Sequence, residues 1–186
     1  MSVLNLSTVP RFLWDKACKC LNDGDVIGLM CTMDNENYLR FIAQNYEALI
    51  ERGIYEAALF DAWTGCRTNW HRYSNSDIQC LFIFANREKM LSLGYPLPGD
   101  GPYTIYRGIA GRGSARRIRG RSWTADFEKA KWFAKRFGHL ENPAVFQATV
   151  DKPCIYAYTN EREEQEFIID PVGIKPKKVW PEKQRA

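Results

Sequence analysis

Glu161-Arg162-Glu163-Glu164-Gln165-Glu166-Phe167-Ile168-Ile169-Asp170 runs from a crowded set of carboxylates into an apolar segment. The β-branched and aromatic residues at 167–169, followed by Pro171, are typical of a short strand. We therefore expect Glu166 to begin a strand and Glu164 to lie on the preceding loop. Residues two apart on an extended chain share a face, so both carboxylates can act on one ligand. A solvated acidic loop is the alternative interpretation of such a charge run.

The composition indicates a soluble globular protein. The chain has 186 residues, of which 45% are hydrophobic and 26% charged, and these are ordinary values for one domain with a substantial core. No apolar run approaches the roughly 18 residues of a membrane span, and no basic segment precedes an apolar block near the N-terminus. We expect no membrane association, no secretion signal and a cytoplasmic location.

The cysteines predict neither a disulfide framework nor a metal site. The six cysteines lack the paired CxxC spacing of a zinc site, and a chain of this length does not need covalent staples. Cys18 and Cys20 form a CxC, but His71 and His139 are the two histidines of the chain, and neither lies near it in sequence. We expect reduced thiols and no bound metal.

Positive charge is concentrated in one segment. The net charge is +4, whereas residues 107–121 alone hold six arginines and no acid, so the rest of the chain is slightly negative. A local basic stretch predicts a local polyanion, such as a dinucleotide, RNA or DNA. The six arginines are Arg107, Arg112, Arg116, Arg117, Arg119 and Arg121.

The chain changes character near a dense turn signal, Tyr95 to Pro102. Residues 1–94 have apolar positions at helical spacing, and one helix is expected to end at Gly53. Another is expected to begin at Ser76, whose hydroxyl would cap it while Gln79 reaches back. The apolar face of the first helix consists of Leu39, Ile42, Tyr46, Leu49 and Ile50.

Residues 95–186 predict an α+β part, and the two parts together are expected to form one compact α+β unit. Strands are expected at 103–107, 144–150 and 154–158. A helix with Phe127, Ala130, Ala134 and Phe137 on one face should follow Ser122-Trp123-Thr124, with Thr124 as its cap and Gly138 at its end.

Three pieces therefore stand in order: a strand ending in Arg107-Gly108, a Ser-x-Thr leading into a helix, and a Glu-x-Glu opening a strand. Nicotinamide displacement from NAD needs all three. An arginine fork suits a diphosphate or ribose, and glycine lets a ligand approach the backbone. The hydroxyls can bond ribose near a helix N-terminus that favours phosphate. A carboxylate stabilises the oxocarbenium-like charge as the glycosidic bond breaks.

With these motifs the sequence resembles the cholera-toxin-like mono-ADP-ribosyltransferases. Tyr106-Arg107-Gly108 looks like the arginine motif of that family, Ser122-Trp123-Thr124 like its serine motif, and Glu164-Gln165-Glu166 like its Glu-x-Glu. The similarity covers roughly 103 to 175. It implies a split β-sandwich that holds NAD in a cleft, often behind a helical part. Trp123 and Thr124 depart from the smaller residues of the strict serine motif.

The resemblance also implies roles. Glu166 would bind the ribose 2′-hydroxyl and be required for NAD cleavage, while Glu164 would help deprotonate a protein arginine, the favoured acceptor. Trp132 and Phe133 are candidates for the aromatic that family members place against nicotinamide, with core packing as the alternative. A nucleic acid is the competing acceptor, and its backbone would lie on Arg112, Arg116, Arg117, Arg119 and Arg121.

Two further classes of function remain open. A non-enzymatic RNA-binding module built on 108–121 would bind in a salt-sensitive manner without NAD and would leave both glutamates without a role. An NAD glycohydrolase, with water as acceptor, would use Glu166 and make Glu164 nearly dispensable. As a small transferase without a signal, the protein would suit a phage effector, or a bacterial toxin with a neutralising antitoxin.

Overall fold

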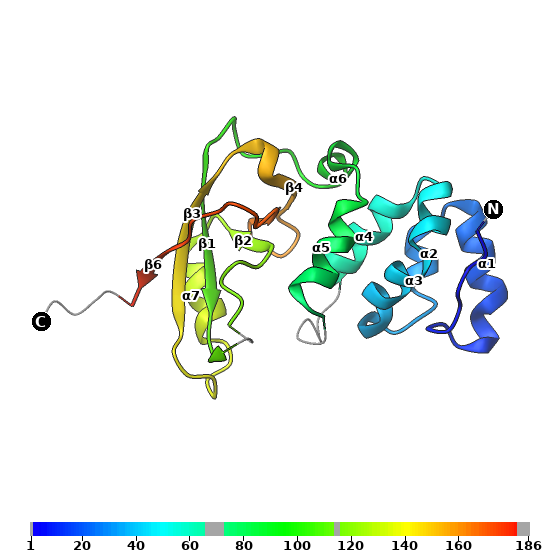
Figure 1. Cartoon of the computed structure of the whole chain (residues 1–186), viewed down its shortest axis with the longest axis horizontal. Coiled ribbons are helices and arrows are strands. Elements are labelled where there is room, and N and C mark those ends of the chain that lie inside the picture. Colours follow the sequence, from blue (N-terminus) through cyan, green and yellow to red (C-terminus); the bar gives the residue numbers. More distant parts are fainter. Residues whose placement is uncertain (1, 66–72, 114–115, 182–186) are drawn as a thin grey trace, which may run out of the picture. The chain divides into compact units, whose positions relative to one another are not determined.

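The computed structural model describes residues 2–65, 73–113 and 116–181 (Figure 1). The chain divides into two compact units, Met1–Met90 and Leu91–Ala186. We refer to them as the helical unit and the sheet unit.

The helical unit is an assembly of short helices, and its described residues include the single turns of 3-10 helix Arg11–Leu13 and Asn35–Asn37. Asp25 and Ser74 cap two of the helices with their side chains. The last helix, α6, crosses the boundary between the units. The helices are α1 (Trp14–Asp23), α2 (Val26–Met30), α3 (Tyr38–Glu51), α4 (Tyr55–Gly65), α5 (Asn75–Ile83) and α6 (Arg87–Leu93).

Helix α3 follows the expected apolar pattern for most of its length. Leu39, Ile42 and Leu49 are buried, and the chain turns out of the helix at Gly53, which adopts the left-handed conformation with φ of 69°. Ile50 is the exception, with 43% of its surface exposed. The helix is kinked at Asn45, whose backbone φ and ψ are not helical. The Asn45 side chain accepts from the Asn5 N–H and donates to the Asn5 carbonyl in the N-terminal segment. The buried positions Phe41, Asn45, Ala48 and Leu49 keep helical spacing across the kink, and Ile50 lies at the edge of the face that they form.

The start of α5 corrects the expected cap. Ser74, two residues before Ser76, accepts a hydrogen bond from the Asp77 N–H, and the Asp77 carboxylate accepts one from the Ser74 N–H. This reciprocal capping box satisfies two backbone donors at once, and aspartate three residues after the cap fills the role that we assigned to Gln79. The apolar positions Ile78, Leu81 and Phe82 are buried as expected.

The sheet unit contains one six-stranded sheet in the order β4-β5-β2-β1-β3-β6 (Figure 1). Every strand pair in it is antiparallel. A single turn of 3-10 helix, Lys152–Cys154, precedes β4. The strands are β1 (Tyr103–Ile109), β2 (Ser122–Thr124), β3 (Ala144–Val150), β4 (Ile155–Thr159), β5 (Glu166–Ile169) and β6 (Lys177–Trp180).

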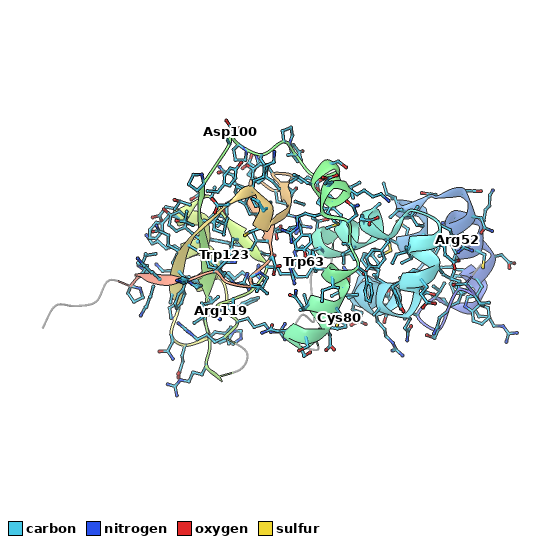
Figure 2. The ribbon with its side chains drawn as sticks, turned by 45° about the horizontal axis from the view of Figure 1, so that its top comes forward. Arg52, Trp63, Cys80, Asp100, Arg119 and Trp123 are labelled. Carbon is cyan, nitrogen blue, oxygen red and sulfur yellow. The ribbon has the colours of Figure 1, made fainter. Side chains whose placement is uncertain are left out.

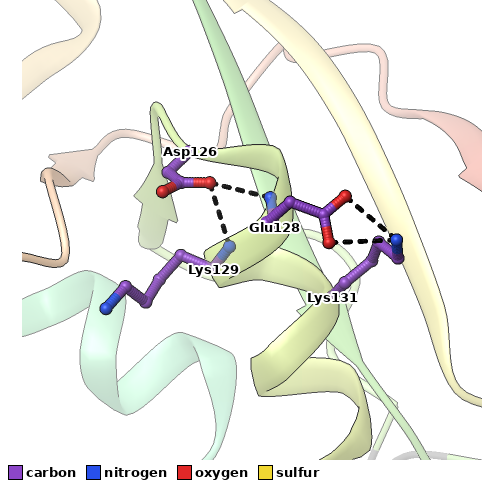
Figure 3. A network of polar contacts seen from close by, with 4 residues as sticks. All are labelled: Asp126, Glu128, Lys129 and Lys131. Carbon is purple, nitrogen blue, oxygen red and sulfur yellow. Dashed lines mark hydrogen bonds and ion pairs between the residues drawn. The ribbon is translucent and has the colours of Figure 1, made fainter.

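Helix α7 (Phe127–Lys135) is the one α-helix that follows a strand of this sheet within the described residues. Its cap is Asp126, not Thr124: one carboxylate oxygen of Asp126 accepts from the N–H groups of Glu128 and Lys129 at 2.7 and 3.0 Å (Figure 3). Thr124 is still within β2, and its hydroxyl instead accepts from the Asp126 N–H. The expected buried positions Ala130 and Ala134 pack on the sheet, while α7 ends at Lys135, before Phe137 and Gly138.

The apolar residues of the sheet unit form two clusters. The larger includes Tyr103, Ile105, Trp123 and Phe167, whose rings and side chains pack on one another. The smaller joins α7 to β3 through Ala130, Ala134 and Val145. These clusters hold β1, β2 and β5 firmly, and those are the strands that carry the three predicted motifs.

The expected α+β class is confirmed, since the chain combines helices with an antiparallel sheet. The sheet assignments at 103–107, 144–150 and 154–158 are also confirmed to within about one or two residues at their ends. Among the described helices, none has the length and apolar character that a membrane crossing requires.

Candidate functional site

The register of the sheet brings the three motifs together. Thr124 on β2 is paired with Glu166 of β5 on one side and with Tyr106 of β1 on the other. The arginine motif, the serine motif and the Glu-x-Glu therefore lie on three adjacent strands, although 59 residues separate Arg107 from Glu166 in sequence. Glu166 is the first residue of β5 and Glu164 lies on the preceding loop, as expected.

Glu166 is the most perturbed carboxylate of the site. Burial raises its pKa above the usual range, and the negative charge of Glu164 raises it further. A hydrogen bond from Ser122 and the positive charges of Arg107 and Arg162 act in the opposite direction. Glu166 is half-buried, and a carboxylate withdrawn from solvent between a like charge and an arginine is characteristic of catalytic sites. Ser122, Arg107, Glu164 and Glu166 thus form one interacting group.

Arg107 is held in place by backbone carbonyls. Its Nε donates to the carbonyl of Arg117 at 3.0 Å, and a terminal nitrogen donates to the carbonyl of Ser122. Burial lowers its pKa to about 10, against the raising effect of Glu166, so Arg107 stays charged at neutral pH. A Cβ on Gly120 would lie 2.3 Å from the Arg107 guanidinium, so a side chain at this position would displace the guanidinium from its present place. The two hydrogen bonds fix the orientation of the guanidinium.

The loop that carries Glu164 is anchored by Thr124. The Thr124 hydroxyl, 4% exposed, donates to the Glu164 carbonyl at 2.6 Å and accepts from the Asp126 N–H at 3.0 Å. The Ala125 N–H donates to the Gln165 carbonyl at 3.1 Å. These bonds fasten the glutamate loop to the end of β2, so the position of the Glu164 carboxylate depends on the serine motif.

The same loop contains two left-handed residues, Glu163 with φ of 55° and Gln165 with φ of 46°. Such conformations cost of order 1–3 kcal/mol for residues with side chains and cluster at functional sites. Asn160 stabilises the loop: its side-chain oxygen accepts from the Gln165 N–H at 3.1 Å and its carbonyl accepts from the Glu163 N–H at 3.0 Å. The two left-handed residues flank Glu164 on either side.

The other members of the arginine and serine motifs have structural contacts. Tyr106 packs edge-on against Phe127, with ring centroids 5.4 Å apart. A Cβ on Gly108 would lie 1.8 Å from the Ala130 carbonyl oxygen, so α7 occupies the space beside this glycine. Trp123 is 2% exposed and donates through its indole N–H to the Gly120 carbonyl at 2.7 Å; Figure 2 shows it among the strands. Its side chain belongs to the core.

The five arginines of the loop differ in their surroundings. Arg121 is 4% exposed, donates to the Ile169 carbonyl and lies over the Tyr156 ring, so it supports the sheet. Arg116 is half-buried and donates to the carbonyls of Gly111 and Asn142. Arg117 is half-buried, Arg112 forms an ion pair with Glu141, and Arg119 is exposed (Figure 2). The exposed positions are Arg112 and Arg119.

Trp132 and Phe133 lie on α7 with their rings 5.1 Å apart, and Trp132 is 56% exposed. Core packing, the alternative for Trp132, is therefore wrong.

His71 lies outside the described residues. Within the ranges that the structure describes, no group of three or more histidine, cysteine, aspartate or glutamate side chains is arranged to hold a metal ion. Described cysteines, Cys18 and Cys20 included, are free thiols.

Asn160 and Gly120 are the site residues that sequence reasoning missed. Asn160 begins the loop after β4, and asparagine is common in turns because its side chain can bond the backbone nearby. Gly120 stands between two arginines, a position where we assigned no role. A comparison of the chain with protein-family models, with curated proteins and with solved structures found no match.

Proposed function

We propose that the protein is an NAD-dependent mono-ADP-ribosyltransferase. The observation that carries the proposal is the convergence of Arg107, Ser122 and Glu166 on neighbouring strands, with Ser122 bonded to Glu166 and Arg107 within electrostatic reach of it. The finer fold of the resemblance, a split β-sandwich that holds NAD in a cleft, is part of the same proposal, as is a cytoplasmic site of action.

In this mechanism Glu166 has the central role. As the bond between nicotinamide and ribose breaks, positive charge develops on the ribose, and an ionised carboxylate beside it lowers the barrier. Ser122 donates to the carboxylate and thereby favours the ionised form. Arg107, charged and fixed by two carbonyls, is suited to hold a phosphate or ribose oxygen of NAD. NAD is the co-substrate, and no metal takes part in this scheme.

Glu164 would act on the acceptor. Its backbone is fixed by Thr124, and its carboxylate lies close enough to Glu166 to raise that group's pKa. A carboxylate in this position can remove a proton from a protein arginine before it attacks the ribose. Nucleic acid is the second candidate acceptor, because Arg112 and Arg119 are exposed beside the site segments. A toxin or phage effector with a neutralising partner remains the expected biological setting.

The test is to incubate the protein with a cell extract and NAD labelled on its adenylate portion, and then to treat the products separately with protease and nuclease. We expect label in a macromolecule that depends on Glu166 and is absent with Glu166→Ala. Glu161→Gln changes an exposed glutamate of the same run and is the matched control, with labelling retained. Protease-sensitive label identifies a protein acceptor and nuclease-sensitive label a nucleic acid. Nicotinamide release without label would identify a glycohydrolase, and neither label nor release would overturn the proposal.

A further inference from the structure

The outer side of α7 carries aromatic rings that are not used in the core. Trp132 is 56% exposed and Phe137, just after the helix, is 47% exposed. Phe133 lies half-buried between them in sequence, with its ring 5.1 Å from that of Trp132. Large aromatic side chains are usually buried, and their gathering at a surface marks an interaction site. We call Trp132, Phe133, Arg136 and Phe137 the α7 aromatic surface.

Cations are interleaved with these rings. The Arg136 guanidinium lies over two of them, 5.2 Å from the Phe133 centroid and 4.6 Å from the Phe137 centroid. Lys135 lies 5.0 Å from the ring of Trp180 on β6. Helix α7 contains Lys129, Lys131 and Lys135 and a single acid, Glu128, which pairs with Lys131 (Figure 3). The surface is therefore both aromatic and basic.

The arginine loop adjoins this surface. The Gly111 N–H donates to the Glu141 carbonyl at 2.6 Å, and Arg116 donates to the carbonyls of Gly111 and Asn142. Residues 141 and 142 follow closely after Phe137, so these bonds dock the loop beside the end of α7. Arg112 forms an ion pair with Glu141, and the two side chains are 76% and 63% exposed. Such exposed pairs are weak, so Arg112 can exchange Glu141 for a phosphate.

We propose that the α7 aromatic surface, together with Arg112, binds single-stranded nucleic acid. Every base offers a π-face that can stack on an exposed ring, and arginine and lysine between the rings can hold the phosphates. A duplex hides its base faces within the stack, so rings at a surface favour unpaired strands. Binding itself requires no NAD. That the bound strand is also the acceptor of ADP-ribose is an extension that rests on the proposed function.

The test is fluorescence anisotropy of a labelled single-stranded oligonucleotide of about 16 nucleotides, in RNA and DNA form, titrated with the full chain without NAD. We expect binding that weakens between about 50 and about 200 mM salt. Trp132→Ala and Phe137→Ala should each lower the affinity about tenfold. Arg112→Gln should reduce the salt slope by about 0.7, the contribution of one phosphate contact to a single strand.

Three controls keep the result interpretable. Phe12→Ala removes an 85% exposed aromatic of the helical unit and should bind as the wild type does. Trp132→Phe keeps a ring and should retain most of the affinity, which separates stacking from misfolding. Glu166→Ala should bind the oligonucleotide with the affinity of the wild type. Loss of transferase activity in that variant would therefore not contradict nucleic-acid binding by the α7 aromatic surface. No binding to the single strands, equal binding to a duplex, or unchanged affinity of both alanine variants would overturn the proposal, and capture of acidic proteins in place of nucleic acid would assign the surface to a protein partner.

Discussion

Each unit contains a glutamate withdrawn from solvent, Glu56 buried and Glu166 half-buried, and the two carboxylates have different surroundings. Glu56 in the helical unit is 7% exposed; its carboxylate accepts from the Asn86 N–H at 2.9 Å at the start of α6, and Lys89 lies 3.9 Å away. Glu166 in the sheet unit has burial and Glu164 opposing its charge and Ser122 and Arg107 favouring it. Glu56 completes a helix end, whereas Glu166 is kept where ionisation is disfavoured.

The difference distinguishes a structural carboxylate from a functional one. The oxygens of a structural carboxylate accept hydrogen bonds from backbone N–H groups that would otherwise lack a partner. A functional carboxylate lies where its surroundings disfavour the ionised form. Binding of a ligand removes this free-energy cost, and the rest of the fold is stable enough to tolerate it. If this is correct, replacing the two glutamates should change activity and stability in different ways.

The largest expected effect is on catalysis. Glu166→Gln keeps the size of the side chain and removes the charge, so nicotinamide release from NAD should fall by about 10²- to 10³-fold. Glu56→Gln should leave the rate unchanged, because its contacts lie within the helical unit. The measurement is nicotinamide release under saturating NAD. A Glu166→Gln protein with wild-type turnover would show that Glu166 is not a functional carboxylate.

A smaller effect is expected from the loop that holds Glu164. Thr124→Val removes the hydroxyl that bonds the Glu164 carbonyl, and Asn160→Ala removes the acceptor for the Gln165 N–H. Transfer to the acceptor should fall about tenfold, the rate equivalent of a lost bond of about 1.4 kcal/mol, while NAD hydrolysis falls less. Asn160→Asp keeps the acceptor oxygen and should restore the ratio of transfer to hydrolysis.

A proportional loss of transfer and hydrolysis in Thr124→Val would contradict this division. It would mean that the loop supports the whole site rather than the acceptor side. Folding of each variant is checked by circular dichroism, so that a lower rate is not confused with a smaller folded fraction.

The pH dependence of nicotinamide release tests which neighbours shift the pKa of Glu166. Because burial and Glu164 raise the pKa of Glu166, the acidic limb of nicotinamide release should lie above the value of about 4.3 for an unperturbed glutamate. Ser122→Ala removes a hydrogen bond that lowers this pKa, so it should move the limb to higher pH. Glu164→Gln removes a like charge and should move it to lower pH. Shifts in the same direction would refute the assignment of these two contributions.

Much of the sheet unit could be predicted from local sequence, and the reasons are visible in individual residues. Phe167, Ile168 and Ile169, followed by Pro171, are typical of a short strand, and Glu166 begins it as expected. The order of the motifs suggested a common site, and antiparallel pairing through Thr124 brings them onto adjacent strands.

The failures concern residues whose role depends on distant partners. Thr124 was expected to cap α7, but it pairs within the sheet and bonds the Glu164 loop, so Asp126 takes the cap. Arg121 was assigned to the basic loop, yet its guanidinium is buried beside Ile169, 48 residues away. Gly108 was expected to admit a ligand, and α7 fills the space beside it. Tertiary contacts decide such roles, and a local pattern contains no information about them.

The smallest expected effect concerns stability, where the two glutamates should differ in sign. A carboxyl group with a raised folded pKa contributes stability that is full below its unfolded pKa and is lost as the pH rises through the folded one. At neutral pH the ionised Glu166 therefore costs stability, and Glu166→Gln should raise the melting temperature, with a smaller gain in acid. Glu56→Ala leaves the Asn86 N–H without its acceptor and should cost about 1–2 kcal/mol, a fall of a few degrees. Differential scanning calorimetry at neutral and acidic pH measures both, and a lower melting temperature for Glu166→Gln at neutral pH would show that its carboxylate is structural after all.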